Sequence, residues 1–168
     1  KEFLDICINH YKYYDINCQG HTVAESQQPS VVREMLEKYR PDILIVTGHD
    51  GLKKGDVDIN SMDSYRTSRY FMQSVIEARK YEPDKNKLCI FAGACQSYFE
   101  ALIKAGANFA SSPGRVLIDC LDPSIVCEKV ATTDPRMIVT PWSVARLTKS
   151  GTKGIGGINT RGRLKPPT

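Results

Sequence analysis

Two short, uninterrupted apolar runs constrain the fold of this chain more than any other feature. The segments Asp42–Thr47 and Leu88–Ala92 are rich in Ile, Leu, Val and Phe, and they end at Gly48 and Gly93. Runs of this length without polar alternation are typical of strands buried on both faces of a parallel sheet. Parallel neighbours need a crossover, and the segment between them, Thr67–Tyr81, has apolar residues at helical spacing. The sequence therefore predicts a βαβ unit.

The rest of the chain continues this alternation of helices and strands. Pro29–Arg40 is expected to be a helix with proline in its first turn, and Cys95–Ala105 a helix ended by Gly106. The other expected helices are Glu2–Tyr13, Asp122–Ala131 with Asp122 as N-cap, and Pro141–Lys149, and the other expected strands are Tyr14–Asn17 and Asn108–Ser111. The order predicts an α/β domain, a three-layer αβα sandwich with a mostly parallel, flavodoxin-like sheet.

The 168 residues suit one domain, which we expect to span residues 1–150. Residues 151–168 are rich in Gly, Arg and Pro, and are expected to form an irregular tail. The chain starts without Met and inside a helical pattern, so we expect an N-terminal part of the full protein to be missing. In a flavodoxin-like order Tyr14–Asn17 would be the second strand, and the missing segment would supply the central strand beside Ile43–Thr47.

Composition and charge exclude several classes of function. The net charge is +4, and no basic stripe interleaved with aromatic residues suggests binding to nucleic acid. No apolar run is long enough for a transmembrane helix. The six cysteines form no CxxC pair, and several lie within apolar runs, as expected for reduced, buried thiols in an intracellular protein.

A histidine and a cysteine follow the two main strands. His49 comes directly after the first run, and Cys95 after the second. Functional sites of such folds lie beyond the carboxyl ends of the strands, so the two side chains are expected to lie close together. A thiolate nucleophile needs a base within hydrogen-bond reach, and a helix beginning at Cys95 would lower the thiol pKa. The N–H of Cys95, with that of Asp50 or Gly51, could stabilise an oxyanion.

Each residue alone has a plainer interpretation, because a lone cysteine is usually structural and a lone histidine at a strand end is usually a polar loop residue. Their joint placement favours a Cys–His dyad. His10 and His21 lie on the first helix and in an early loop, and the other five cysteines are expected to be buried or peripheral.

Neither a metal site nor a cofactor is indicated. Asp56–Asn60 begins like a calcium loop, but Ser61 stands where glycine is needed and Thr67 where the bidentate glutamate is needed. Zinc is not expected with three scattered histidines and no paired cysteines. The run Gly154–Gly157 has the wrong order for a phosphate-binding loop.

The layout of apolar run, turn and His, then apolar run, turn and Ala-Cys, resembles the caspase–gingipain–clostripain clan of cysteine peptidases. Longer stretches carry a more specific likeness: Pro41–Asp50, Ser68–Phe71, Ala78–Pro83, Phe91–Ile103, Ala105–Pro113 and Gly154–Gly162. These stretches resemble the YabG family of sporulation-specific cysteine peptidases. The resemblance covers nearly all of the chain from about Arg40 onward.

The resemblance implies a caspase-like fold, with Cys95 as nucleophile and His49 as base. It further implies a cysteine endopeptidase that needs no cofactor and processes spore-coat and cortex precursor proteins. Such an enzyme would act in the mother cell and spore coat, and its own N-terminal segment would be a further partner. Arg-specific members of the clan often carry an acidic residue two positions before the cysteine, where this chain has Gly93. Specificity therefore does not carry over through that position.

Two alternatives to an endopeptidase stay open, a non-catalytic scaffold or sensor and an amidohydrolase that uses the same dyad on small amides. Cleavage after basic residues is a further hypothesis, because aspartates are frequent near the expected site: Asp50, Asp56, Asp58, Asp63, Asp119 and Asp122. A carboxylate pocket pairs well with a guanidinium. The competing interpretation makes these aspartates turn-formers and helix caps.

Overall fold

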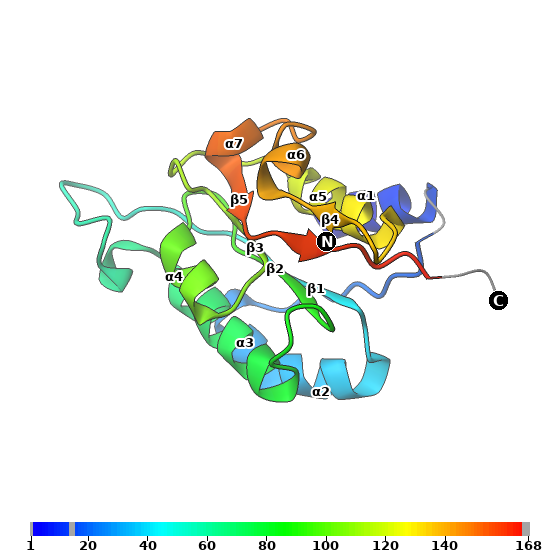
Figure 1. The fold of residues 1–168 in the computed structure, drawn as a ribbon. Helices are drawn as coiled ribbons and strands as arrows, with labels where there is room; N and C mark the ends of the chain where they lie inside the picture. The colour runs from blue at the N-terminus through cyan, green and yellow to red at the C-terminus, as the bar shows by residue number, and fades with distance from the viewer. Residues whose placement is uncertain (1, 14–15, 166–168) are drawn as a thin grey trace.

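The computed structural model describes residues 2–13 and 16–165 (Figure 1). Its main sheet has the strand order β1–β2–β3–β5, made of β1 (Ile43–Val46), β2 (Cys89–Ala92), β3 (Phe109–Ser111) and β5 (Ile155–Gly157). The first three strands run parallel, and β5 is antiparallel to β3. A second, antiparallel pair consists of β4 (Ile138–Val139) and β6 (Thr160–Arg161). The fold is therefore α/β with a mixed, mostly parallel sheet, as the apolar runs predict.

Helices cover both faces of this sheet. The α-helices are α1 (Glu2–Tyr13), α2 (Gln28–Tyr39), α3 (Ser68–Tyr81), α4 (Phe99–Ala105), α5 (Asp122–Thr132), α6 (Pro141–Ala145) and α7 (Gly151–Gly154). Figure 1 shows α2 and α3 on one side of the sheet and α1, α5 and α6 on the other. Two 3₁₀ turns, η1 (Glu25–Gln27) and η2 (Met62–Ser64), lie in the connections.

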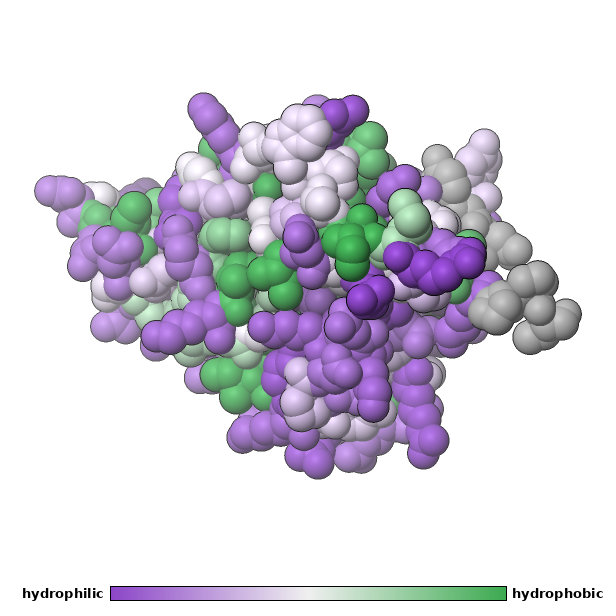
Figure 2. Space-filling view, viewed as in Figure 1, coloured by the Kyte–Doolittle hydropathy of each residue, from purple (hydrophilic) through white to green (hydrophobic). Residues whose placement is uncertain are grey.

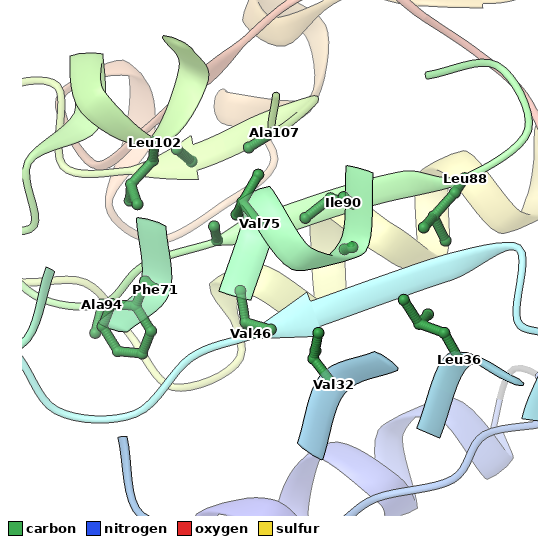
Figure 3. Close-up of a cluster of buried hydrophobic side chains, with 13 residues drawn as sticks. Val32, Leu36, Val46, Phe71, Val75, Leu88, Ile90, Ala94, Leu102 and Ala107 are labelled. Carbon is green, nitrogen blue, oxygen red and sulfur yellow. The ribbon is translucent and has the colours of Figure 1, made fainter. Parts of the chain in front are cut away.

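Alternate side chains of β2 belong to two separate cores. Ile90 and Ala92 pack with α2 and α3, whereas Cys89 and Phe91 pack with α5 and α6. All four residues are fully buried, as expected for a strand covered on both faces. Figure 3 shows Val32 of α2 and other residues of the first core converging on the sheet.

The distribution of polar residues on the surface agrees with this packing. Helix α2 buries Val32 and Leu36, and the surface over it in Figure 2 is mainly hydrophilic. Across residues 2–13 and 16–165, no helix combines the length and apolar character needed to cross a membrane.

The prediction of an irregular tail is wrong, because α7, β5 and β6 all lie within residues 151–161. Ile155 is buried, and β5 completes one edge of the main sheet. A Cβ at Gly156 would come within 2.8 Å of the Phe99 ring, and one at Gly157 would overlap the carbonyl of Asn108. These glycines therefore permit close packing of strand β5. In the sequence alone, the same Gly-rich composition indicates a flexible segment.

The expected strand Tyr14–Asn17 is not formed over its described half. Ile16 and Asn17 have no strand structure, and Tyr14 and Asp15 lie outside the described residues. Within the part of the chain that the structure describes, β1 pairs with β2 and with no other strand. The predicted central strand beside β1 therefore stays a prediction.

The expected helix at Pro141–Lys149 is shorter than its sequence pattern, since α6 ends at Ala145. Asp122 is the first residue of α5 rather than its N-cap, because Leu121 occupies the N-cap position.

Candidate active site

His49 and Cys95 lie beyond the carboxyl ends of two paired strands. Val46 of β1 is in register with Ala92 of β2, and each candidate residue follows its strand end by three positions. Paired strands lie about 4.8 Å apart, so the two loops leave the sheet as neighbours. The sequence-based expectation that the two residues share one edge of the sheet is met at the level of the backbone.

Cys95 lies in a tight turn, and the expectation that it opens a helix is wrong. Helix α4 begins only at Phe99. Gln96 has a left-handed backbone conformation, with φ of 57°, which a right-handed helix cannot contain. The Oγ of Ser97 accepts the N–H of Ala94 at 2.9 Å and so closes the turn around Cys95. No helix N-terminus therefore lies at this thiol, contrary to the sequence-based expectation.

The half-buried thiol of Cys95 contacts the backbone of Ile118. Its Sγ accepts the Ile118 N–H at 3.3 Å and lies 3.7 Å from the Ile118 carbonyl oxygen. The N–H donor can stabilise a thiolate, and the carbonyl can accept the thiol proton. The N–H of Cys95 has no acceptor among residues 2–13 and 16–165.

The imidazole of His49 lies at the surface and contacts an acidic side chain. Its side chain is 89% exposed, and Nδ1 lies 3.8 Å from Oε2 of Glu25. The same Oε2 accepts the backbone N–H of His49 at 3.3 Å. No hydrogen bond joins His49 to Cys95 in the described structure. The fold thus brings the two loops together but leaves the two side chains apart.

The carboxylate of Asp50 connects the loop after β1 to the turn around Cys95. Its Oδ1 accepts the N–H groups of Gly51 at 2.8 Å and Thr67 at 2.9 Å. Its Oδ2 accepts the hydroxyl protons of Ser97, at 2.7 Å, and Ser68. The Gly51 N–H is therefore occupied by Asp50, and of the two expected oxyanion donors we retain the N–H of Asp50.

Residues after β3 hold the cysteine turn from its other side. Ser111 donates its hydroxyl to the Ala94 carbonyl at 2.6 Å. The N–H of Gln96 is shared by Oγ of Ser112 and the Val116 carbonyl, both at 3.0 Å. The turn around Cys95 is therefore fixed by β3 and by the segment that follows it.

A cavity of about 300 Å³ adjoins Ile118, the residue that contacts the Cys95 thiol. It is lined by Leu117, Ile118, Asp119, Lys149 and Ser150. The carboxylate of Asp119 lies 3.7 Å from the exposed ammonium of Lys149. Asp119, whose Oδ1 also accepts the N–H of Leu121 at 3.0 Å, is thus an acidic side chain of the pocket next to Ile118.

Three of the other candidate aspartates have structural roles or are paired. Asp122 is completely buried and accepts the N–H groups of Asp119 at 2.9 Å and Lys149 at 3.0 Å. Asp58 accepts the N–H of Asn60 at 2.9 Å, and Asp63 pairs with Arg69 at 3.0 Å. These contacts agree with the turn-former interpretation for most of the set.

Four of the other cysteines have properties that suit a nucleophile poorly. Burial raises the pKa of Cys89 to about 12 and also raises the pKa of Cys127. Burial is likewise the largest cause of the raised pKa of Cys18 and of Cys120. A raised thiol pKa leaves little thiolate at neutral pH.

Three residues of this site carried no signal that we recognised in the sequence. Glu25 lies in a polar segment before α2, Ile118 in a loop after β3, and Ser97 in what reads as a helix. A polar Ser two positions after a candidate nucleophile is a weak hint of turn closure. The other two contacts join segments far apart in the chain. No cluster of His, Cys, Asp and Glu able to hold a metal occurs among the described residues.

Comparison with known proteins identifies the family of the chain. Residues 1–167 match the family described as YabG peptidase U57. The chain is 45% identical over 163 residues to the "Sporulation-specific protease YabG" of Bacillus subtilis (strain 168). That match covers 97% of this chain and 56% of the relative, so the chain spans little more than half of the relative's length. No solved structure matches. The chain belongs to the YabG peptidase U57 family.

Proposed function

We propose that this chain carries the catalytic residues of a sporulation-associated cysteine endopeptidase, with Cys95 as nucleophile and His49 as general base. The observation that carries the proposal is their placement three residues beyond the paired ends of β1 and β2. Membership of a peptidase family supports the proteolytic activity in this proposal. We also propose a caspase-like fold, with which the helices on both faces of a mostly parallel sheet are compatible.

The proposed reaction is acyl transfer to the cysteine. Sγ of Cys95 attacks the peptide carbonyl carbon, its proton passes to His49, and His49 protonates the leaving amine. Water then hydrolyses the thioester and frees the thiol and the new carboxylate. The N–H groups of Cys95 and Asp50, which have no acceptor among the described residues, are the proposed oxyanion donors.

His49 must approach Cys95 for this chemistry. Its exposed ring is free of packing constraints and can rotate about its side-chain torsions, whereas the cysteine turn is fixed by hydrogen bonds. Catalytic hydrogen bonds are often long or unformed before substrate binds. We propose that substrate binding draws the imidazole toward the thiol.

The proposed substrates are proteins of the spore coat and cortex, processed in the mother cell of sporulating bacteria. The relative's name supports a role in sporulation. Asp119 in the cavity beside Ile118 supports cleavage after basic residues, because a carboxylate there would pair with a guanidinium. Hydrolysis after Arg is expected to exceed hydrolysis after Leu by about tenfold or more, and Asp119→Asn should remove that difference.

The dyad is tested with Cys95→Ala and His49→Ala in a protein-cleavage assay. Each variant should lose at least about a hundredfold in rate while keeping its circular dichroism spectrum. Cys18→Ala and His21→Ala are matched controls away from the site and should retain wild-type rates. Folded dyad variants that keep more than a tenth of the rate would refute the proposal. Hydrolysis confined to small amides would instead identify an amidohydrolase.

A further inference from the structure

We infer that Glu25 is a positioning residue for His49, and so the third member of the catalytic group. The inference rests on the proposed function of His49. Oε2 of Glu25 accepts the His49 backbone N–H at 3.3 Å and lies 3.8 Å from Nδ1 of the same residue. One carboxylate oxygen therefore contacts both the backbone and the ring of the proposed base.

The lack of a side chain at Gly48 leaves room for the Glu25 carboxylate in this position. A Cβ at Gly48 would overlap Oε2 of Glu25 and would lie 3.0 Å from its Cγ and Cδ. The backbone of Gly48 does not have a positive φ, so the turn itself does not require glycine here. Glycine at this position instead makes room for the Glu25 side chain, directly before His49.

The segment that carries Glu25 is tied to the end of β1. The side-chain amide of Gln28 donates to the Thr47 carbonyl at 2.9 Å and to the Val23 carbonyl at 3.3 Å. Thr47 in turn donates its hydroxyl to the carbonyl of Gly93, after β2, at 2.7 Å. These contacts hold Glu25 beside the loop of His49 and hold that loop beside the loop of Cys95.

Burial differs between the two partners in the direction that positioning requires. The side chain of Glu25 is 23% exposed, whereas that of His49 is 89% exposed. The carboxylate is the fixed partner and the imidazole the moving one. A carboxylate acceptor at Nδ1 selects the tautomer that carries its proton there and leaves Nε2 free to take the thiol proton. It also stabilises the positive charge that the ring acquires.

The test compares Glu25→Gln, Glu25→Asp and Gly48→Ala in the peptide-cleavage assay, with kcat and KM measured separately. Glu25→Gln keeps the size and one acceptor oxygen but loses the charge, and should lower kcat about ten- to a hundredfold with little change in KM. Glu25→Asp should recover part of that loss. Gly48→Ala displaces the carboxylate, so its combination with Glu25→Gln should cost no more than the larger single effect.

Glu37→Gln is the matched control, since Glu37 is an exposed glutamate of α2 paired with Arg33. It should leave kcat unchanged. Thermal unfolding of every variant separates a positioning role from loss of the fold. A Glu25→Gln rate within threefold of wild type, with Cys95→Ala and His49→Ala inactive, would overturn the role of Glu25 and leave the dyad standing. Full activity of His49→Ala would instead overturn the proposed function.

Discussion

Replacement of Asp50 tests whether the hydrogen bonds between the loop of His49 and the turn around Cys95 stabilise the fold. Each hydroxyl that contacts Oδ2 of Asp50 already accepts a backbone N–H, Ser97 from Ala94 and Ser68 from Tyr98. Each hydroxyl proton is therefore directed at the carboxylate. With two backbone N–H groups on Oδ1, every contact of this carboxylate comes from a donor.

The expected magnitude follows from that count of donors. Asp50→Ala leaves two backbone N–H groups and two hydroxyls without their acceptor, each at a cost of about 1 kcal/mol, so we expect a loss of about 4 kcal/mol. Asp50→Asn keeps one acceptor oxygen and turns an NH₂ group toward two donors. We expect it to cost about 1–3 kcal/mol, less than alanine.

Urea unfolding followed by far-ultraviolet circular dichroism measures both free energies. Asp58→Asn is the control, because Asp58 makes one side-chain contact, to the N–H of Asn60, at an exposed turn. It should cost less than about 1 kcal/mol. An Asp50→Asn variant within 0.5 kcal/mol of wild type, or as damaging as Asp50→Ala, would refute the donor-only description of this carboxylate.

Three further outcomes are expected. The Arg79 guanidinium donates to three backbone carbonyls and to the Asn108 side chain, so Arg79→Lys should lower the free energy of unfolding in urea by about 2–4 kcal/mol. A smaller loss would contradict this. Burial raises the pKa of Cys89 from 9.0 to about 12, so the stability contributed by its protonated thiol is complete below pH 9 and is lost as pH rises toward 12. Cys89→Ala should therefore weaken the fall in unfolding free energy over this pH range, and an unchanged pH slope would contradict this. The backbone amides of Ile43 and Ile45 face the edge of β1 that has no partner strand in the described structure, so their hydrogen exchange should slow in a longer form of the protein that contains the expected central strand. Equal exchange rates in both forms would count against that strand.

Elements with a strong local pattern were predictable from the sequence. Strands β1 and β2 are uninterrupted apolar runs, and helices α2 and α3 have apolar residues at helical spacing. Since the carboxyl ends of neighbouring parallel strands share one edge, the strand ends also placed His49 and Cys95 in adjacent loops.

The features that sequence reasoning missed depend on contacts between distant segments. Strand β5 is held by pairing with β3, and its Gly-rich sequence has no apolar periodicity. The turn at Cys95 interrupts a good helical pattern because Ser97 and the segment after β3 bind its backbone groups. Tertiary hydrogen bonds override local propensity at such positions. Glu25 meets His49 across α2 and β1, and no local pattern reports such a contact.

Three of the four described non-glycine residues with left-handed backbone lie in the cysteine turn or in the segment after β3 that supports it, and the fourth, Arg40, ends α2. Gln96, Ser112 and Arg115 have φ values of 57°, 63° and 55°. Such conformations cost about 1 kcal/mol or more each, and persist where surrounding contacts fix them. The N–H of Gln96 has two acceptors, and the N–H of Ser112 donates to the Gly154 carbonyl at 2.7 Å. The strained backbone therefore lies in the segments around Cys95, where hydrogen bonds fix it.

The His49 side chain, in contrast, is held by few contacts. Its ring is exposed and makes one contact, to Glu25, at a distance that leaves room for rotation. In the proposed mechanism the nucleophile is fixed and the base is movable: the Cys95 thiol stays against Ile118, while the His49 imidazole rotates toward it. Because Glu25 holds the backbone N–H of His49 as well as facing its ring, rotation of the ring can occur without displacement of the loop. Substrate binding then has to reorganise one side chain rather than the sheet edge, which keeps the entropic cost of reaching the reactive geometry small.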